Sequence, residues 1–108
     1  MDLLLLHGSR ARGDAGPRSD WDVGMLGEAD PVDVAAVLAR ILGTDAVDVV
    51  DLAGASALLR FRAARDGVLL QERRAGASLA FREEATRFWC DAGPVIRAAQ
   101  EQVLAGLR

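Results

Sequence analysis

A stretch near the start of the chain combines a glycine–serine pair with two closely spaced carboxylates. Gly8 and Ser9 follow an apolar run, and Asp20 and Asp22 stand two positions apart, with ten residues between Ser9 and Asp20. Side chains alternate between the faces of a strand, so the two carboxylates would point the same way. At about 6.5 to 7 Å apart they repel each other unless a cation lies between them. We therefore expect a divalent metal site at Asp20 and Asp22.

The glycine turn supplies the second half of a nucleotide site. Gly8 allows the backbone to pass close to a ligand. Ser9 offers a hydroxyl and a main-chain N–H at the expected start of a helix, which is favourable for a phosphate. Arg10 and Arg12 add positive charge nearby. Because Mg²⁺ usually binds through one or two carboxylates and substrate phosphates, this combination indicates chemistry on a nucleoside triphosphate.

Residues 46–52 form a β-branched, strand-like run that carries two further aspartates. Asp48 and Asp51 would lie on opposite faces of this strand. A charged side chain inside such a run is costly to bury unless it has a partner or a metal ion. A third metal-binding carboxylate is one interpretation. The alternative is that Asp51 ends the strand or caps a helix, and that Asp48 is a surface charge.

The same stretches resemble the signature of the nucleotidyltransferase superfamily that includes DNA polymerase beta. The matching residues are Gly8-Ser9-Arg10-Ala11-Arg12-Gly13 and Ser19-Asp20-x-Asp22. Their form is most similar to the minimal nucleotidyltransferases, the MntA-type antitoxins of HEPN-domain toxins. Residues 47–52, 59–61 and 67–70 also look like that group, so the resemblance covers most of the chain. It implies an α+β fold, with a small mixed β-sheet and helices packed mainly on one face.

The resemblance also assigns roles to the carboxylates. Asp20 and Asp22 would hold two Mg²⁺ ions in the two-metal arrangement. Asp48 would be the third metal ligand, with Asp51 as the second choice. The third carboxylate would complete the shell of one ion and help to deprotonate the attacking hydroxyl.

The reaction that the resemblance implies is the transfer of AMP from ATP to a hydroxyl, with release of pyrophosphate. Ser9, with the Gly8 turn, would bind the β- and γ-phosphates, and Arg10 and Arg12 would steady the same charge. In the resembling family the acceptor is a tyrosine hydroxyl on the HEPN toxin, whose RNase activity the modification neutralises. The sequence contains no tyrosine, which excludes self-modification at tyrosine. Its length of 108 residues leaves no room for an acceptor-binding domain, which favours a protein acceptor.

Two other functions remain open. The fold could serve as a non-catalytic module that neutralises the toxin by complex formation alone. It could also transfer nucleotides to a small molecule or RNA. The net charge of −3 and the sequence pI of about 5.0 disfavour a nucleic-acid-binding surface, so direct binding of nucleic acid is not expected.

The composition fits a single domain, residues 1–108. The one cysteine, Cys90, allows no internal disulfide and fits a reducing cytoplasm. No apolar run approaches the length of about 20 residues that a membrane span needs. A cytoplasmic location without membrane contact is therefore expected.

Periodicity and turn residues predict the elements that position the site. Strands are expected at residues 3–6, 20–26, 46–52 and 68–72, and helices at 31–42, 57–66, 78–90 and 95–107. Residues 10–19 should begin as a short helix and end as a loop. Asp30 should cap the start of the first long helix and Gly43 should end it. Gly93 and Pro94 should separate the last two helices. The apolar stripe of that first long helix is Val34, Leu38, Ile41 and Leu42.

Several aromatic and basic side chains have two interpretations. His7 is expected to be structural rather than catalytic. Trp21 has the opposite strand parity to the aspartates and is expected in the core rather than stacked on a base. Phe88 and Trp89 either belong to the core or anchor a partner. Arg62, on the helix predicted at 57–66, is expected on a solvated face, and the alternative is contact with a triphosphate or an acidic partner.

Overall fold

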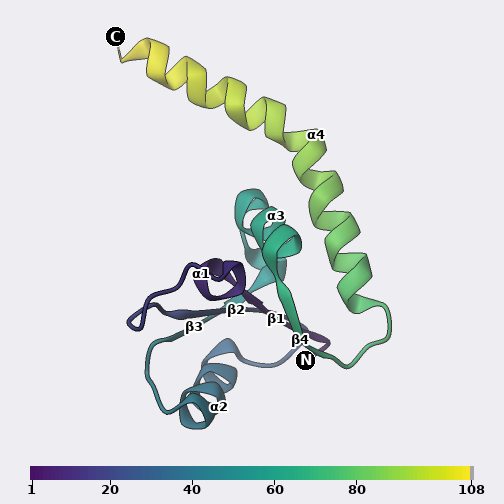
Figure 1. The fold of residues 1–108 in the computed structure, drawn as a ribbon. Helices are drawn as coiled ribbons and strands as arrows, with labels where there is room; N and C mark the ends of the chain where they lie inside the picture. The colour runs from purple at the N-terminus through teal and green to yellow at the C-terminus, as the bar shows by residue number, and fades with distance from the viewer. Residues whose placement is uncertain (108) are drawn as a thin grey trace.

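The computed structural model describes residues 1–107, which form one four-stranded sheet with helices on both faces (Figure 1). The strands are β1 (Leu3–His7), β2 (Trp21–Leu26), β3 (Val47–Asp51) and β4 (Val68–Glu72). The helices are α1 (Gly8–Arg12), α2 (Pro31–Leu42), α3 (Ala57–Asp66) and α4 (Ala77–Gly106), with a short 3-10 helix η1 (Leu52–Gly54) after β3. The predicted strands and the first two long helices are confirmed to within a residue or two at their ends.

The sheet is mixed, in the order β3-β2-β1-β4. Strand β1 is antiparallel to both β2 and β4, whereas β2 and β3 run parallel. A parallel pair needs a crossover connection, and α2 provides it. Figure 1 shows α2 on one face of the sheet and α1, α3 and α4 on the other. The predicted α+β fold, with helices mainly on one face, is confirmed.

Strand β1 contributes to the core on both faces, because its side chains alternate. Leu3 and Leu5 are fully buried in the cluster that also holds Phe81 of α4. Leu4 belongs to the second cluster, on the α2 side. The β1–β4 register shifts between Leu4 and Leu5, which leaves Leu70 of β4 without a partner on β1.

Helix α2 begins and ends where the sequence predicts. The Asp30 carboxylate accepts a hydrogen bond from the Val32 N–H at 2.9 Å, and Gly43 ends the helix at φ 69°. Its predicted stripe is only half correct. Val34 and Leu38 pack against the sheet, but Ile41 is 72% exposed. Leu42 is also partly exposed, at 38%, so the last turn of α2 is less buried than the turns that carry Val34 and Leu38.

Helix α4 corrects the prediction of two helices separated at Gly93 and Pro94. It is one helix of 30 residues with Pro94 inside it. A proline inside a helix costs about 3 kcal/mol, because it removes one N–H donor and crowds the preceding turn. The flanking alanine, glutamate, glutamine and leucine residues favour helix strongly, and the helix changes direction instead of ending (Figure 1).

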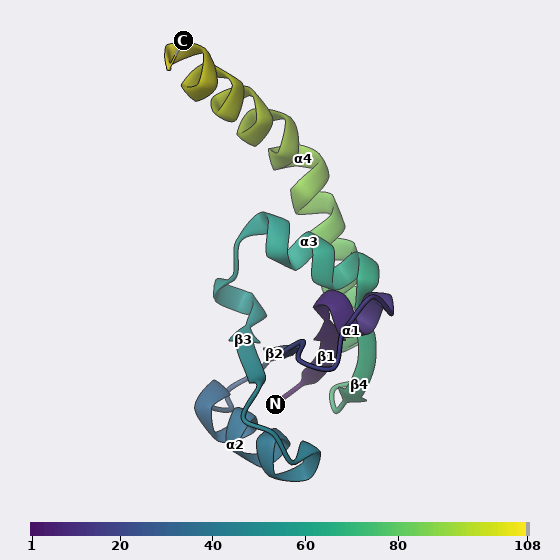
Figure 2. The ribbon, with the colours of Figure 1, turned by 60° about the vertical axis from the view of Figure 1, so that its left-hand side comes forward.

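The two halves of α4 have different surroundings. The first half packs on α3, where Phe81 is buried and Trp89 stacks on Phe61 with ring centroids 5.4 Å apart. Trp89 is half-buried against Phe61, so the core interpretation holds for it only in part, whereas Phe88 is 49% exposed and does not fit that interpretation. The second half projects away from the sheet (Figure 2). Within residues 1–107, no helix is both long and apolar enough to cross a membrane.

Candidate nucleotide and metal site

A cavity of about 450 Å³ opens on the face of the sheet that α1 and α3 cover. It gathers a glycine turn, two carboxylates, two guanidinium groups and two apolar side chains from five different elements. The lining residues are His7, Gly8, Ser9, Arg12, Asp22, Asp48, Val50, Leu59 and Arg62. Five residues of the predicted site therefore lie on its wall: Gly8, Ser9, Arg12, Asp22 and Asp48. A groove of about 550 Å³ along the end of α4 has no charged lining residue and cannot hold a triphosphate on its own.

Gly8 brings the backbone against the carboxylate of Asp22. Its φ of 71° lies in the left-handed region that glycine tolerates best. A Cβ atom at this position would collide with the Asp22 Oδ2 atom and lie 3.1 Å from its Cγ. The predicted close approach of backbone at Gly8 is thus present. It keeps Ser9, the next residue, beside the carboxylates.

Asp22 and Asp48 are direct neighbours across the sheet. They occupy matching positions on the parallel strands β2 and β3, which lie about 4.8 Å apart. Both line the cavity; Asp22 is half-buried and Asp48 is exposed. Their closeness raises the cost of two negative charges unless a cation neutralises them.

This pair fits a Mg²⁺ ion that completes its shell with phosphate oxygens and water. Within residues 1–107, no group of three or more histidine, cysteine, aspartate or glutamate side chains is gathered closely enough to hold an ion unaided. A site with two protein carboxylates needs the remaining oxygen ligands from a substrate. The donor set is therefore suited to an ion that arrives with a nucleotide.

Asp20 lies one residue before β2 and is exposed, outside the residues that line the cavity. The peptide groups on both sides of it are fixed. The Ser19 carbonyl accepts hydrogen bonds from Arg10, and the Trp21 N–H donates to the Ala46 carbonyl at 2.8 Å. The structure thus anchors the backbone of Asp20 but does not bring its side chain to the cavity wall.

The guanidinium group of Arg10 is occupied elsewhere. It bonds to the Ser19 carbonyl and lies over the Trp21 ring, with Cζ 4.1 Å from the ring centroid. Trp21 is half-buried beneath it, so the core expectation for this tryptophan holds only in part. Trp21 is the first residue of β2, an inner strand of the sheet, and there an arginine side chain covers its ring.

Asp51 has the capping role that was the alternative interpretation. Its carboxylate accepts a hydrogen bond from the Ala53 N–H at 3.1 Å and caps η1. It is not among the residues that line the cavity, whereas Asp48 is. Of the two candidates, the structure brings only Asp48 to the neighbourhood of Asp22.

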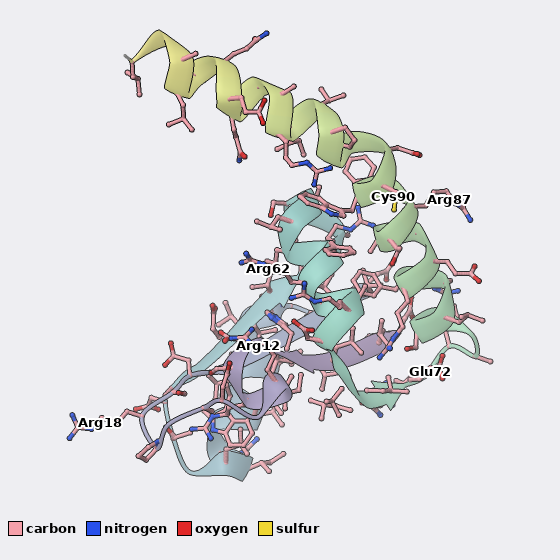
Figure 3. The ribbon with its side chains drawn as sticks, turned by 45° about the horizontal axis from the view of Figure 1, so that its top comes forward. Arg12, Arg18, Arg62, Glu72, Arg87 and Cys90 are labelled. Atoms are coloured by element: carbon pink, nitrogen blue, oxygen red, sulfur yellow. The ribbon has the colours of Figure 1, made fainter. Side chains whose placement is uncertain are left out.

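Two arginines form the basic side of the cavity. Arg12 comes from α1 and Arg62 from α3, and Figure 3 shows both on the same side of the molecule. Arg12 also contacts the Asp14 carboxylate at 3.3 Å, a largely exposed pair. The sequence predicts a solvated face for Arg62, with triphosphate contact as the alternative; the side chain is exposed and lines the cavity. Its spacing of three residues from Leu59 puts both on one helix face, which is the signal that could have identified it.

His7 lies at the end of β1, opposite Asp22 in the β1–β2 register. It is 7% exposed, and its Nε2 atom has no hydrogen-bond partner within the described chain. Burial lowers the pKa of the imidazole, although the charges of Asp22 and Asp48 act in the opposite direction. A buried, neutral ring fits the predicted structural role.

Comparison with known proteins agrees with this geometry. A family model described as polymerase beta, nucleotidyltransferase, matches residues 1–75, the part of the chain that contains every residue of the cavity. The chain belongs to this nucleotidyltransferase family. The resemblance noted in the sequence is thereby confirmed.

Relatives of this nucleotidyltransferase include a protein adenylyltransferase MntA from Aphanizomenon flos-aquae. The two are 34% identical over 86 residues, an alignment that covers 67% of this chain. The chain spans 57% of the length of that relative.

The nucleotidyltransferase is also similar to chains in solved structures. One is in a crystal structure of a toxin–antitoxin with AMP-PNP, with a TM-score of 0.79 and 26% identity over 95% of this chain and 86% of that one. Another is in a tri-AMPylated Shewanella oneidensis HEPN toxin in complex with MNT antitoxin. Its TM-score is 0.72, at 24% identity over 95% of this chain and 82% of that one. The second likeness concerns the fold alone.

Proposed function

We propose that this protein is a Mg²⁺-dependent nucleotidyltransferase that moves AMP from ATP to a hydroxyl of a partner HEPN-domain RNase toxin. The observation that carries the proposal is the register of Asp22 and Asp48 beside the Gly8–Ser9 turn, around one cavity. A tyrosine hydroxyl of the toxin is the proposed acceptor, and its modification neutralises the toxin. The proposed setting is the cytoplasm.

The phosphates of ATP would lie between the glycine turn and the two arginines. Ser9 offers its hydroxyl and main-chain N–H to the β- and γ-phosphates. Arg12 and Arg62 supply positive charge from two helices, α1 and α3. Charge-assisted hydrogen bonds to phosphate are about twice as strong as neutral ones. Val50 and Leu59 leave an apolar part of the wall for the less polar part of the nucleotide.

Asp22 and Asp48 are the residues proposed to hold Mg²⁺, with Asp20 as a further ligand for a second ion. When bound, Mg²⁺ would neutralise charge on the transferred phosphate and on the leaving pyrophosphate. Asp48 is the more exposed of the cavity carboxylates, so an acceptor hydroxyl can approach it from solvent. We propose that Asp48 accepts the proton of that hydroxyl.

The proposed reaction balances without a further reactant. The acceptor oxygen forms a bond to the α-phosphorus of ATP, and the bond from that phosphorus to the pyrophosphate oxygen breaks. The hydroxyl proton passes to Asp48 and then to solvent, and pyrophosphate leaves. The relatives support the choice of donor and acceptor: one is named a protein adenylyltransferase, and another structure holds an AMPylated HEPN toxin.

The second candidate is a non-catalytic module that neutralises the toxin by binding it. The projecting half of α4 favours a binding role, because its apolar side chains line an open groove. Binding and catalysis are compatible, so the question is which of them neutralises the toxin.

The test is to incubate the purified HEPN partner with this protein, ATP and Mg²⁺, and to weigh the partner by intact-protein mass spectrometry. We expect the partner to gain one or more AMP units, and Asp22→Asn to abolish the gain. Asp45→Asn is the matched control, because Asp45 is exposed and outside the cavity.

Absence of any mass gain, together with a stable complex that Asp22→Asn forms equally well and that still silences the toxin, would overturn the catalytic proposal. The same result would establish the binding module. A gain that persists in Asp22→Asn would instead place the chemistry outside this cavity.

A further inference from the structure

We propose that Arg10 is a positioning residue that holds the backbone of Asp20 in register with Ser9, and thereby sets how the Asp20 carboxylate can reach a metal ion bound with the nucleotide. The inference rests on the proposed function, since it concerns the same metal and nucleotide site. It replaces the predicted role of Arg10 as a phosphate ligand. The Arg10 side chain acts on the site indirectly, through its contacts with Ser19 and Trp21, the two residues that flank Asp20.

The contacts of Arg10 join α1 to the end of the following loop, nine residues further along the sequence. Arg10 follows Ser9 directly in α1, while Ser19 directly precedes Asp20. Its Nε and Nη2 atoms donate to the Ser19 carbonyl oxygen at 3.1 and 2.8 Å. The same guanidinium lies over the ring of Trp21, with Cζ 4.1 Å from the centroid. The Arg10 side chain therefore contacts both residues that flank Asp20.

The loop between Gly13 and Asp20 has little other support. The remaining hydrogen bonds described near it are local: the Gly16 N–H donates to Ser19 Oγ at 2.9 Å, and the Ser19 N–H donates to the Gly16 carbonyl at 3.1 Å. The Asp14 N–H donates to the Ser9 carbonyl at 3.1 Å, which fixes the start of the loop. Arg12 also bonds to Asp14 at the start of the loop, and the Trp21 N–H bonds to the Ala46 carbonyl just beyond its end. Among the described hydrogen bonds, only those of Arg10 join α1 to the end of the loop.

The chemistry of the contact requires arginine. A guanidinium presents several N–H donors in a rigid plane, so it can bond a carbonyl with its edge while its face stacks on an indole. A lysine ammonium has no such plane and cannot do both. Because both the edge and the face of Arg10 are engaged, and because Arg10 does not line the cavity, it is not free to bind a triphosphate.

The test is a double-mutant cycle of Arg10→Met and Asp20→Asn, read by the affinity for Mn²⁺ in the presence of AMP-PNP. Methionine keeps an unbranched apolar stem and removes every donor. Residues that orient a metal ligand typically cost 10- to 100-fold in metal affinity when mutated, so we expect Arg10→Met to weaken Mn²⁺ binding about tenfold. In the Asp20→Asn background it should add less than about twofold, since Arg10 acts through Asp20.

Two controls separate positioning from other roles. Arg18→Met removes an arginine from the same loop that points away from the body in Figure 3, and it should leave Mn²⁺ affinity unchanged. The affinity for AMP-PNP without a divalent ion should change by less than about twofold in Arg10→Met, because Ser9, Arg12 and Arg62 remain. Should Arg10→Met fail to fold, Arg10→Lys keeps the charge and is expected to show the same Mn²⁺ defect.

Additive effects in the cycle, or a loss of AMP-PNP affinity without metal, would overturn the inference. Equal Mn²⁺ affinity in Arg10→Met and the wild-type protein would do so as well, even with a lower melting temperature. The result is independent of AMP transfer. A wild-type protein that binds Mn²⁺ and AMP-PNP but modifies no partner would refute the proposed function and still decide the role of Arg10.

Discussion

The backbone of Gly8 lies directly against the carboxylate of Asp22, with no room for a Cβ atom between them. The end of β1 and the start of β2 meet at this point, so the turn that carries Ser9 and the strand that carries Asp22 share one contact. Any side chain at position 8 must displace the carboxylate or the turn. This relationship leads to the first prediction.

Gly8→Ala should disable the site beyond its effect on stability. A non-glycine residue in the left-handed region costs about 1 to 2 kcal/mol of unfolding free energy, and the collision with Asp22 adds displacement of the carboxylate. Gly43→Ala is the matched control, because Gly43 has a φ of 69° and open space around its Cβ position. Both variants should lose similar stability by chemical denaturation, but only Gly8→Ala should lose AMP transfer, by 100-fold or more. Equal transfer by the two variants would contradict the contact.

Asp48→Ala and Asp51→Ala should have opposite profiles. Asp48 lines the cavity, so its loss should reduce AMP transfer at least 100-fold with little effect on stability. Asp51 caps η1, so its loss should cost about 1 kcal/mol of unfolding free energy and leave transfer nearly intact. Denaturation and transfer assays on both variants decide the assignment, and the reverse pattern would make Asp51 the third carboxylate.

Arg62→Ala should raise the KM for ATP about tenfold with kcat little changed. Hydrogen bonds to charged groups contribute about 1.5 to 3 kcal/mol, and this one would be formed with bound ATP both before and during transfer. Arg65→Ala is the control on the same helix, because Arg65 bonds to Asp66 at 2.9 Å and does not line the cavity. An unchanged KM in Arg62→Ala would return this residue to the solvated face that its sequence suggests.

Val103→Asp should weaken the complex with the toxin at least tenfold without changing the melting temperature. Val103 is 64% exposed on the projecting half of α4, so the charge meets water in the free protein and an apolar surface in a complex. Leu79→Asp is matched in exposure, at 63%, but lies at the start of α4. Calorimetric titration of the toxin should show weaker binding by Val103→Asp than by Leu79→Asp. Equal affinities would exclude the α4 groove as the docking surface.

Local signals explain why much of this fold could be predicted from the sequence. Asp30, Pro31 and Gly43 act within one or two turns of α2, so the residue types alone mark its ends. The glycine–serine turn and Asp22 are likewise fixed by strand alternation and short spacing. Signals of this kind depend on residues that are close in the sequence, so they can be recognised without knowing how the chain packs.

The features that could not be predicted depend on distant contacts. Arg10 is one residue from the phosphate-binding turn in sequence, but its partners are Ser19 and Trp21. Arg62 shares a helix face with Leu59, but it reaches the cavity only because α3 packs on α1 and β1. Pro94 has a strong local preference to end a helix, and the helix-forming residues on either side outweigh it.

The outer strand of the sheet limits how the protein can self-associate. Strand β4 exposes Val68, Leu69 and Leu70 on a free edge, which is the usual template for amyloid-like stacking. The shifted register at Leu4 and Leu5 leaves Leu70 out of the ladder. Strand β4 ends at the charged Glu72, and Arg73 follows it. An irregular strand bounded by charge is a poor template for a second β4, so the edge resists aggregation despite its apolar sequence.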